Sequence, residues 1–171
     1  MAVAVGFEFR RNTGAELTVI EPQSGKQWIG PRVPRPFQSG LWQVSELQAG
    51  EGSGIAMVLG ISRPILNDVK ASTQAQSLDI GEYMNFEPLE GCSLAAIDHD
   101  VPECAHRMAV AAVDILSKLQ AKIGCRPIHL FLAGPAAFAV LLGQQLSNVG
   151  PIQCYEWSAG ERQYVPTLQL A

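Results

Sequence analysis

Two short turns in this chain each pair a glycine that ends an apolar run with a proline that opens the next segment. The first is the stretch Gly60-Ile61-Ser62-Arg63-Pro64. Ser62 offers a hydroxyl donor, and Arg63 offers a planar guanidinium that can hold phosphate oxygens through two parallel hydrogen bonds. The first turn therefore carries the residue types that contact a phosphate.

The second turn is almost bare of side chains and reads Ala133-Gly134-Pro135-Ala136-Ala137. It contains no Ser, Thr, Asp or Asn to cap the helix that follows, so the first backbone N–H groups of that helix need another partner. A phosphate or the polar edge of a base would satisfy them, because the helix dipole favours negative charge there. The alternative stays open that each Gly-Pro pair merely opens a buried helix and that Arg63 pairs with a surface carboxylate.

The segments around these turns alternate between strand and helix patterns. Continuous apolar runs predict buried strands at residues 55–59 and 128–133, which lead into the two turns. Helices are predicted at residues 64–69, 100–123 and 136–146, and further strands at residues 2–10, 17–20, 83–86, 93–97, 152–157 and 164–170. This rhythm predicts an α/β domain with a Rossmann-like, mostly parallel sheet flanked by helices. Ligands bind where such strands end and the strand order reverses, so the two turns would frame one crevice.

An irregular segment rich in proline and aromatic residues, residues 21–54, precedes the first buried strand. We interpret it as an ordered N-terminal excursion packed on the domain, with a helical turn near residues 45–48. Trp42, Phe37 and Arg35 are its candidates for stacking on bases and neutralising phosphates, with Trp42 as the preferred contact. The alternative is a loop anchored by its aromatic side chains, which we expect for at least one of Trp28 and Trp42.

Composition limits the classes of partner. The chain has 171 residues, 47% hydrophobic and 16% charged, which fits a single domain over residues 1–171. A net charge of −4 makes long DNA or RNA an unexpected partner, because phosphate-driven binding needs a broad cationic face. The sequence has no run of about 18 apolar residues and no CxxC pair among its four cysteines. We also expect no signal peptide, because Met1 leads directly into an alternating run. We therefore expect a cytoplasmic protein with reduced thiols and no membrane contact.

Catalytic and metal-binding patterns are missing from the sequence. Five potential ligands stand close together but match no closed zinc site: Asp98, His99, Asp100, Cys104 and His106. No Gly-x-Ser-x-Gly elbow surrounds Ser62, and neither a Walker lysine nor GxGxxG follows a predicted strand. We expect no cofactor, no metal and no enzyme active site in this chain.

Three stretches of the sequence also carry a resemblance to a known family. They are Gly60-Ile61-Ser62-Arg63-Pro64-Ile65, the run His129-Leu130-Phe131-Leu132-Ala133-Gly134-Pro135-Ala136-Ala137, and Cys154-Tyr155-Glu156-Trp157 with Tyr164-Val165-Pro166. These stretches resemble SAVED domains, bacterial sensors related to CARF domains and built from two CARF-like halves. The resemblance extends over residues 55–170, and over residues 1–54 only the stretch 7–9 fits.

The resemblance implies a CARF-like receptor for a cyclic oligonucleotide in antiviral defence systems such as CBASS. Our hypothesis is a cyclic tri- or tetranucleotide rich in adenine, with Ser62 and Arg63 on its phosphates and the amides of Gly134, Ala136 and Ala137 on its ring. The resemblance further implies head-to-tail self-association and an effector domain or subunit, a nuclease, TIR or protease. Two alternatives remain: a Rossmann-like enzyme acting on a nucleotide or small molecule, and an assembly domain without a ligand.

Overall fold

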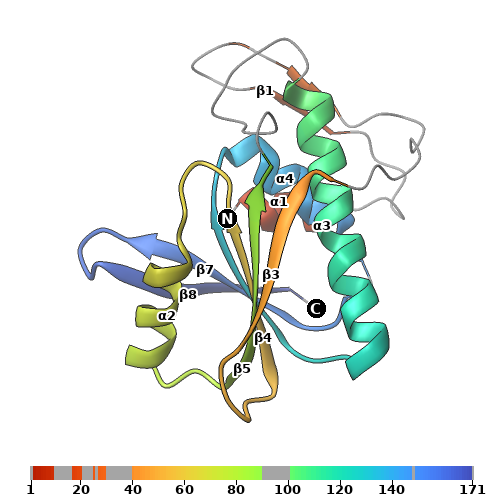
Figure 1. Cartoon of the computed structure of the whole chain (residues 1–171). Coiled ribbons are helices and arrows are strands. Elements are labelled where there is room, and N and C mark those ends of the chain that lie inside the picture. The colour runs from red at the N-terminus through yellow and green to blue at the C-terminus, as the bar shows by residue number, and fades with distance from the viewer. Residues whose placement is uncertain are drawn as a thin grey trace.

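The computed structural model describes residues 2–9, 17–20, 25, 27–29, 40–89, 101–147 and 149–170. Its centre is a six-stranded sheet in the order β3-β5-β4-β6-β7-β8 (Figure 1). The strands are β3 (Trp42–Gln48), β4 (Gly54–Gly60), β5 (Ile80–Pro88), β6 (Ile128–Ala133), β7 (Ile152–Ser158) and β8 (Gln163–Leu170). The four inner strands pair in parallel, and an antiparallel strand closes each edge. The predicted mostly parallel α/β sheet is confirmed.

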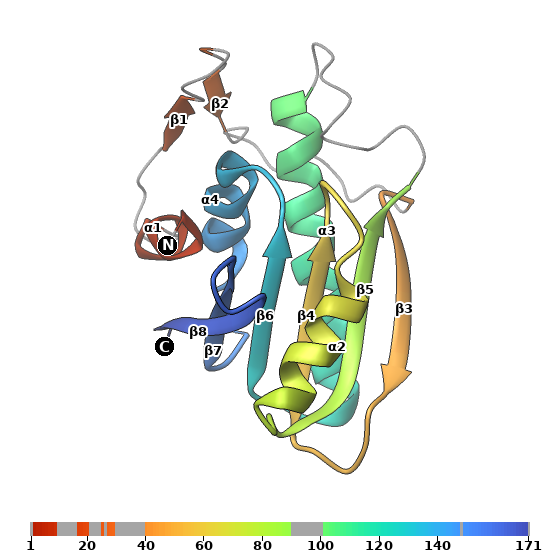
Figure 2. The ribbon, with the colours of Figure 1, turned by 90° about the vertical axis from the view of Figure 1, so that its left-hand side faces the viewer.

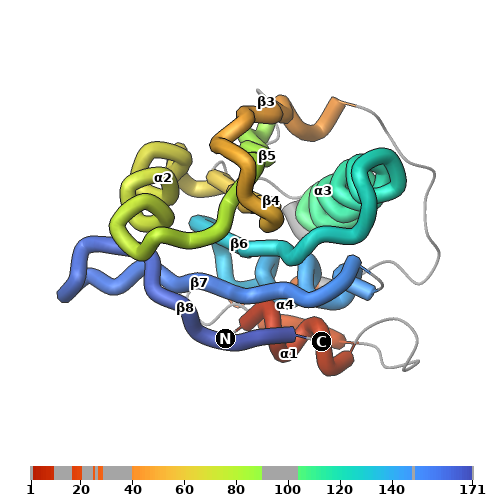
Figure 3. Tube along the Cα trace, turned by 90° about the horizontal axis from the view of Figure 1, so that it is seen from below, coloured from red at the N-terminus to blue at the C-terminus, as the bar shows by residue number. Residues whose placement is uncertain are grey.

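Helices cover both faces of the sheet. The short helix α2 (Leu66–Ala75) lies on one face, and α3 (Val101–Ile123) and α4 (Ala136–Gln145) lie on the other (Figure 3). A fourth helix, α1 (Ala2–Glu8), packs on the outer side of α4 (Figure 2). The chain leaves β4 towards β5 and later returns to place β6 on the opposite side of β4. The strand order therefore reverses between β4 and β6. Among the described residues, no helix is both long and apolar enough to cross a membrane.

The prediction of a strand at residues 2–10 is wrong, because this segment forms α1. The alternation of Val3 with Val5 suggested a period of two, but the buried residues Val3, Gly6 and Phe7 recur at the spacing of a helix face. Gly6 and Gly143 let the backbones of α1 and α4 touch, since a Cβ on either glycine would collide with a main-chain oxygen of the other helix. Tertiary packing thus decides the conformation of this segment.

The N-terminal excursion also differs from its prediction. Residues 17–20 supply β1 (Thr18–Ile20), which pairs with β2 (Gln27–Ile29) rather than with residues 2–10. The helical turn near residues 45–48 is wrong as well, because these residues belong to β3 and pair antiparallel with β5 along the whole strand. The strand predicted at residues 93–97 and the first residue of the helix predicted at residues 100–123 lie outside the described residues.

At the amino ends of the inner strands, Arg126 donates hydrogen bonds to the backbone. The guanidinium of Arg126 donates hydrogen bonds to the carbonyl oxygens of Gly52 and Gly54, at 2.8 and 3.1 Å, and also to that of Ser53. Its Nη1 lies 3.5 Å from a carboxylate oxygen of Glu82, which is 7% exposed. The opposite, carboxyl edge of the sheet is the one where the two glycine turns lie.

Candidate ligand-binding site

The two glycine turns lie side by side at the carboxyl edge of the sheet. Gly60 at the end of β4 is level with Ala133 at the end of β6. The backbone N–H groups of Ile61 and Ser62 both donate to the carbonyl oxygen of Ala133, at 2.9 and 3.0 Å. The predicted pairing of the two turns at the reversal of strand order is therefore confirmed.

The second turn presents backbone rather than side chains. Pro135 is the cap residue of α4 in an extended conformation and makes no side-chain hydrogen bond to the first turn of this helix. Gly134 and Ala136 are exposed, whereas Ala137 is only 4% exposed. Of the three amides named from the sequence, those of Gly134 and Ala136 therefore belong to exposed residues.

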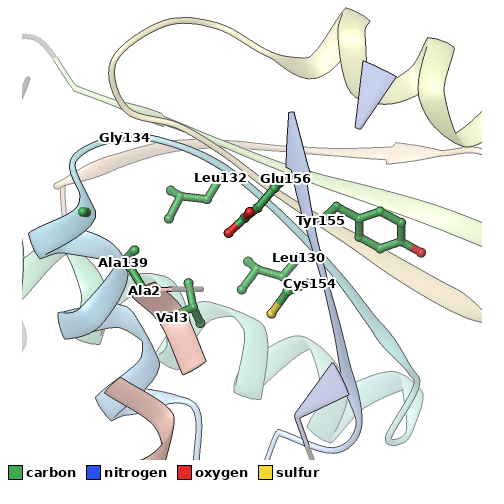
Figure 4. Close-up of a pocket in the computed structure, with 10 residues that line it drawn as sticks. Ala2, Val3, Leu130, Leu132, Gly134, Ala139, Cys154, Tyr155 and Glu156 are labelled. Carbon is green, nitrogen blue, oxygen red and sulfur yellow. The ribbon is translucent and has the colours of Figure 1, made fainter. Parts of the chain in front are cut away.

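A pocket of about 190 Å³ adjoins this turn on the side of α4 and α1 (Figure 4). Its walls are mostly apolar: Ala2 and Val3 of α1, Leu130 and Leu132 of β6, and Ala136 and Ala139 of α4. Glu156 of β7 points its carboxylate towards this space, and the ring of Tyr155 points away from it (Figure 4). Pockets that enclose drug-sized ligands measure roughly 300–1,000 Å³, so this pocket is too small to enclose a ligand of that size.

Cys154 also lines the pocket, but it does not supply a nucleophile. Burial raises the pKa of the Cys154 thiol to about 11, so the thiol stays protonated at neutral pH. His129 lies elsewhere, because it is level with Ala56, four residues before Gly60 and thus roughly 13 Å along the strand. In the described part of the chain, no three His, Cys, Asp or Glu side chains gather to hold a metal ion.

The first turn carries an arginine that already has a carboxylate partner. Nη1 of Arg63 donates to Asp68 Oδ2 at 2.7 Å and to the carbonyl oxygen of Pro64 at 3.4 Å. The hydrogen bond to Asp68 raises the pKa of Arg63. The side chain of Arg63 is 50% exposed, and Ser62 beside it is exposed as well. The pairing with a surface carboxylate that the sequence left open is thus what the structure contains, at a site open to solvent.

The structure corrects the role expected of Trp42. Its side chain is 7% exposed, its indole N–H donates to the carbonyl oxygen of Met108 at 2.8 Å, and its ring meets Phe86 and Phe138 edge-on. This side chain belongs to the core and has no free face for a base. Trp28 is 2% exposed, so the expectation that at least one of these tryptophans is an anchor is confirmed. Phe37 and Arg35 lie outside the described residues.

Trp157, which lies near the end of β7, is not among the residues predicted from the sequence to contact a ligand. Its side chain is 42% exposed, and the guanidinium carbon of Arg63 lies 5.8 Å from the centre of its ring. One signal was present in the sequence: Trp157 occupies the end of a predicted strand at the same edge as the two turns. Alternation along the strand puts Trp157 and Glu156 on opposite faces of the sheet.

Comparison with known proteins gives a family match and several similar folds. The family model described as "SMODS-associated and fused to various effectors sensor domain", SAVED, matches residues 1–170. The CD-NTase-associated protein 4 of Moraxella osloensis is 39% identical over 91 residues, which is 53% of this chain and 19% of that protein. The protein of the same name from an Acinetobacter species is 44% identical over 43 residues, 25% of this chain and 9% of that protein.

The similar solved structures are receptors that contain a SAVED/CARF domain. The Acinetobacter baumannii Cap4 receptor with the cyclic trinucleotide 3′3′3′-cAAA has a TM-score of 0.77 at 22% identity, covering 98% of this chain and 35% of the receptor. The same receptor with 2′3′3′-cAAA has a TM-score of 0.74 at 21% identity over the same shares. The Moraxella osloensis Cap4 receptor has a TM-score of 0.67 at 19% identity, over 99% and 34% of the two chains. This chain thus spans about a third of the solved receptors and about a fifth or less of the curated relatives.

Proposed function

The chain belongs to the SAVED family of sensor domains, and we propose that it binds a cyclic oligonucleotide at the carboxyl edge of β4 and β6. One observation carries this proposal: an uncapped helix start and a half-exposed arginine lie side by side at the reversal of strand order. Backbone N–H groups and a guanidinium can both donate hydrogen bonds to phosphate oxygens. The Acinetobacter baumannii Cap4 receptor, which has the same fold, is solved with two cyclic triadenylates, and this supports a ring of three adenylates as the ligand. A ring of four adenylates is the other ligand that we propose.

The size of the pocket bears on how such a ring would lie. A volume of about 190 Å³ receives a single base, so the rest of a cyclic oligonucleotide would extend over the two turns. The exposed part of the ligand would then need a second protein surface. This need supports head-to-tail association of the chain that is driven by the ligand. Residues 1–171 would act as one sensor domain in the cytoplasm. Their association would activate a nuclease, TIR or protease effector.

Isothermal titration tests the binding step. The purified chain is titrated with 3′3′3′-cAAA, 2′3′3′-cAAA and a cyclic tetraadenylate, and linear triadenylate serves as the control. We expect saturable heat with at least one cyclic ligand and a weaker response to the linear one. Absence of heat with every cyclic tri- and tetranucleotide, from protein whose folding is verified by circular dichroism, contradicts the proposal.

Light scattering tests the association step. We expect the mass of the particle to increase only when the cyclic ligand is present. Association of equal extent without any nucleotide favours the alternative of an assembly domain. Conversion of a mononucleotide by the purified chain favours the alternative of a Rossmann-like enzyme.

A further inference from the structure

We propose that Trp157 is the base-stacking contact of this site and that Arg63 binds the phosphate next to the stacked base. The proposal rests on the proposed function, because it states how one nucleotide of that ligand is recognised. It also replaces Trp42, whose ring is enclosed in the core, by an aromatic side chain that is half exposed near the end of β7.

The exposure of Trp157 distinguishes it from the other two tryptophans. Its side chain is 42% exposed, whereas Trp28 and Trp42 are 2% and 7% exposed. Tryptophan is highly buried on average, so an exposed indole at the end of a strand indicates a binding contact. Any base can stack on such a ring, since every base has an aromatic face.

Arg63 supplies the charge that a nucleotide needs beside its base. The guanidinium carbon lies 5.8 Å from the centre of the Trp157 ring. Within the described residues, both hydrogen bonds of Arg63 leave from Nη1, to Asp68 and to the carbonyl of Pro64, so Nε and Nη2 remain as donors. Asp68 holds the guanidinium in place but also offsets part of its charge. We therefore expect stacking on Trp157 to contribute to affinity alongside the phosphate contact.

Helix α2 holds the hairpin of β7 and β8 that carries this tryptophan. The N–H of Tyr164 donates to Ser72 Oγ at 2.9 Å, and Gln76 Nε2 donates to the carbonyl oxygen of Tyr164 at 2.6 Å. The ring of Tyr164 in turn lies edge-on to Trp157, with centroids 5.3 Å apart. Because Arg63 lies in the turn that leads into α2, the phosphate contact and the stacking contact belong to one connected unit. Ser72 and Gln76 are positioning residues for this unit.

The consecutive residues Glu156 and Trp157 extend the site across the edge of the sheet. Glu156 lines the pocket on the α4 face, and Trp157 lies on the α2 face near Arg63. A ring-shaped ligand that lies over this edge would place one base in the pocket and another against Trp157. A mononucleotide would reach only one of these places.

Fluorescence titration with 3′3′3′-cAAA tests the stacking contact in the full chain. Wild type should show a ligand-dependent change in tryptophan emission. Trp157→Phe should keep the affinity, measured by calorimetry, within about threefold, because phenylalanine still stacks, and should lose most of the emission change. Trp157→Ala should weaken binding about tenfold or more, in line with the stacking energies of bases on aromatic side chains.

Two further variants separate stacking from a general effect on the fold. Leu168→Ala shortens another exposed apolar side chain, 40% exposed on β8, and should leave affinity unchanged. Ser72→Ala should weaken binding in wild type and have a smaller effect in the Trp157→Ala background, because the two residues act through the same ring. All variants are compared at a temperature at which circular dichroism shows them folded.

The outcomes distinguish this proposal from the proposed function. If wild type binds 3′3′3′-cAAA but Trp157→Ala binds it equally well and the emission does not change, the stacking contact is overturned and the receptor function stands. If wild type binds no cyclic oligonucleotide, both fail together. Weaker binding by Trp157→Ala with retention in Trp157→Phe and Leu168→Ala supports the proposal.

Discussion

The two faces of the sheet are covered by different amounts and kinds of structure. On one face, the 23-residue helix α3 together with α4 encloses a large core of mainly aliphatic residues. On the other, the 10-residue helix α2 covers a smaller cluster in which Phe131 stacks on Tyr155, with centroids 4.4 Å apart, and meets Tyr164 edge-on. At the margin of this smaller cluster, Trp157 and Arg63 remain half exposed.

This difference separates stability from recognition within one small domain. Burial of apolar area is the main source of folding free energy, and most of that area lies on the α3 and α4 face. The α2 face carries fewer buried apolar residues, so it can expose an aromatic ring and a cation without loss of the core. Three measurements test this division of roles.

The largest effect should come from Trp42, which belongs to the α3 face. Trp42→Ala removes a buried ring and its hydrogen bond to Met108, and it should lower the free energy of unfolding by about 3–5 kcal/mol. Chemical denaturation measures this change, and Trp42→Phe gives a milder version if the alanine variant does not fold. Affinity for 3′3′3′-cAAA should stay the same in the folded protein. If Trp42→Ala instead lost affinity at unchanged stability, Trp42 would be a ligand contact, and the division of roles between the two faces of the sheet would be wrong.

An intermediate effect should come from Arg63, on the α2 side, and it should appear in binding. Arg63→Ala should weaken binding of the cyclic ligand by about 1.5–3 kcal/mol, the usual loss for a charged hydrogen bond. Lys118→Ala is the matched control, because Lys118 on α3 pairs with Asp114 at 2.6 Å in a similar surface ion pair. Both variants should change stability by less than about 1 kcal/mol. Equal affinities of the two variants would remove Arg63 from the site.

The smallest effect should be the response of His129 to pH. Burial lowers the pKa of His129 below its ordinary value near 6.5, and its Nδ1 lies 2.8 Å from the hydroxyl oxygen of Tyr155. Between the two pKa values the unfolded chain binds more protons than the folded one, so stability should fall as the pH drops below about 6.5. Thermal unfolding at pH 7.5 and 5.5 measures this fall, which should be smaller in His129→Gln.

Asp79 should not contribute to the loss of stability between pH 7.5 and 5.5. Hydrogen bonds from Ser53 lower the pKa of Asp79, so its contribution to stability is complete above about pH 4 and is lost only in more acidic solution. A loss of stability between pH 7.5 and 5.5 that is identical in wild type and His129→Gln would assign the effect to other groups.

Local sequence signals were sufficient for the centre of the fold. The continuous apolar runs of β4 and β6, each followed by glycine and proline, indicated buried parallel strands and the two turns at their ends. These elements are covered on both sides, so their hydrophobicity alone identifies them. Their alignment at Gly60 and Ala133 followed from the rule that parallel strands end at one edge.

The margins of the fold depend on contacts that no local pattern contains. Residues 2–8 alternate like a strand, but they form α1 because Gly6 and Gly143 let this segment pack closely against α4, a helix far along the chain. Trp42 and Trp157 are equally aromatic in sequence. Trp42 is buried although it lies on the edge strand β3, because Met108 of α3 and Phe138 of α4 contact its ring, whereas Trp157 on the inner strand β7 stays 42% exposed. The sequence therefore predicts the edge of the proposed site, but not which aromatic residue is exposed at that edge.

The shared carbonyl of Ala133 has a mechanical consequence. Because Ile61 and Ser62 both bond to this one oxygen, displacement of either turn stretches the bonds that hold the other. The turns lead into α2 and α4, which lie on opposite faces, so a movement at this point would tilt helices on both sides of the molecule at once. Faster amide hydrogen exchange at Ile61 and Ser62 on ligand addition would register such a movement at its origin.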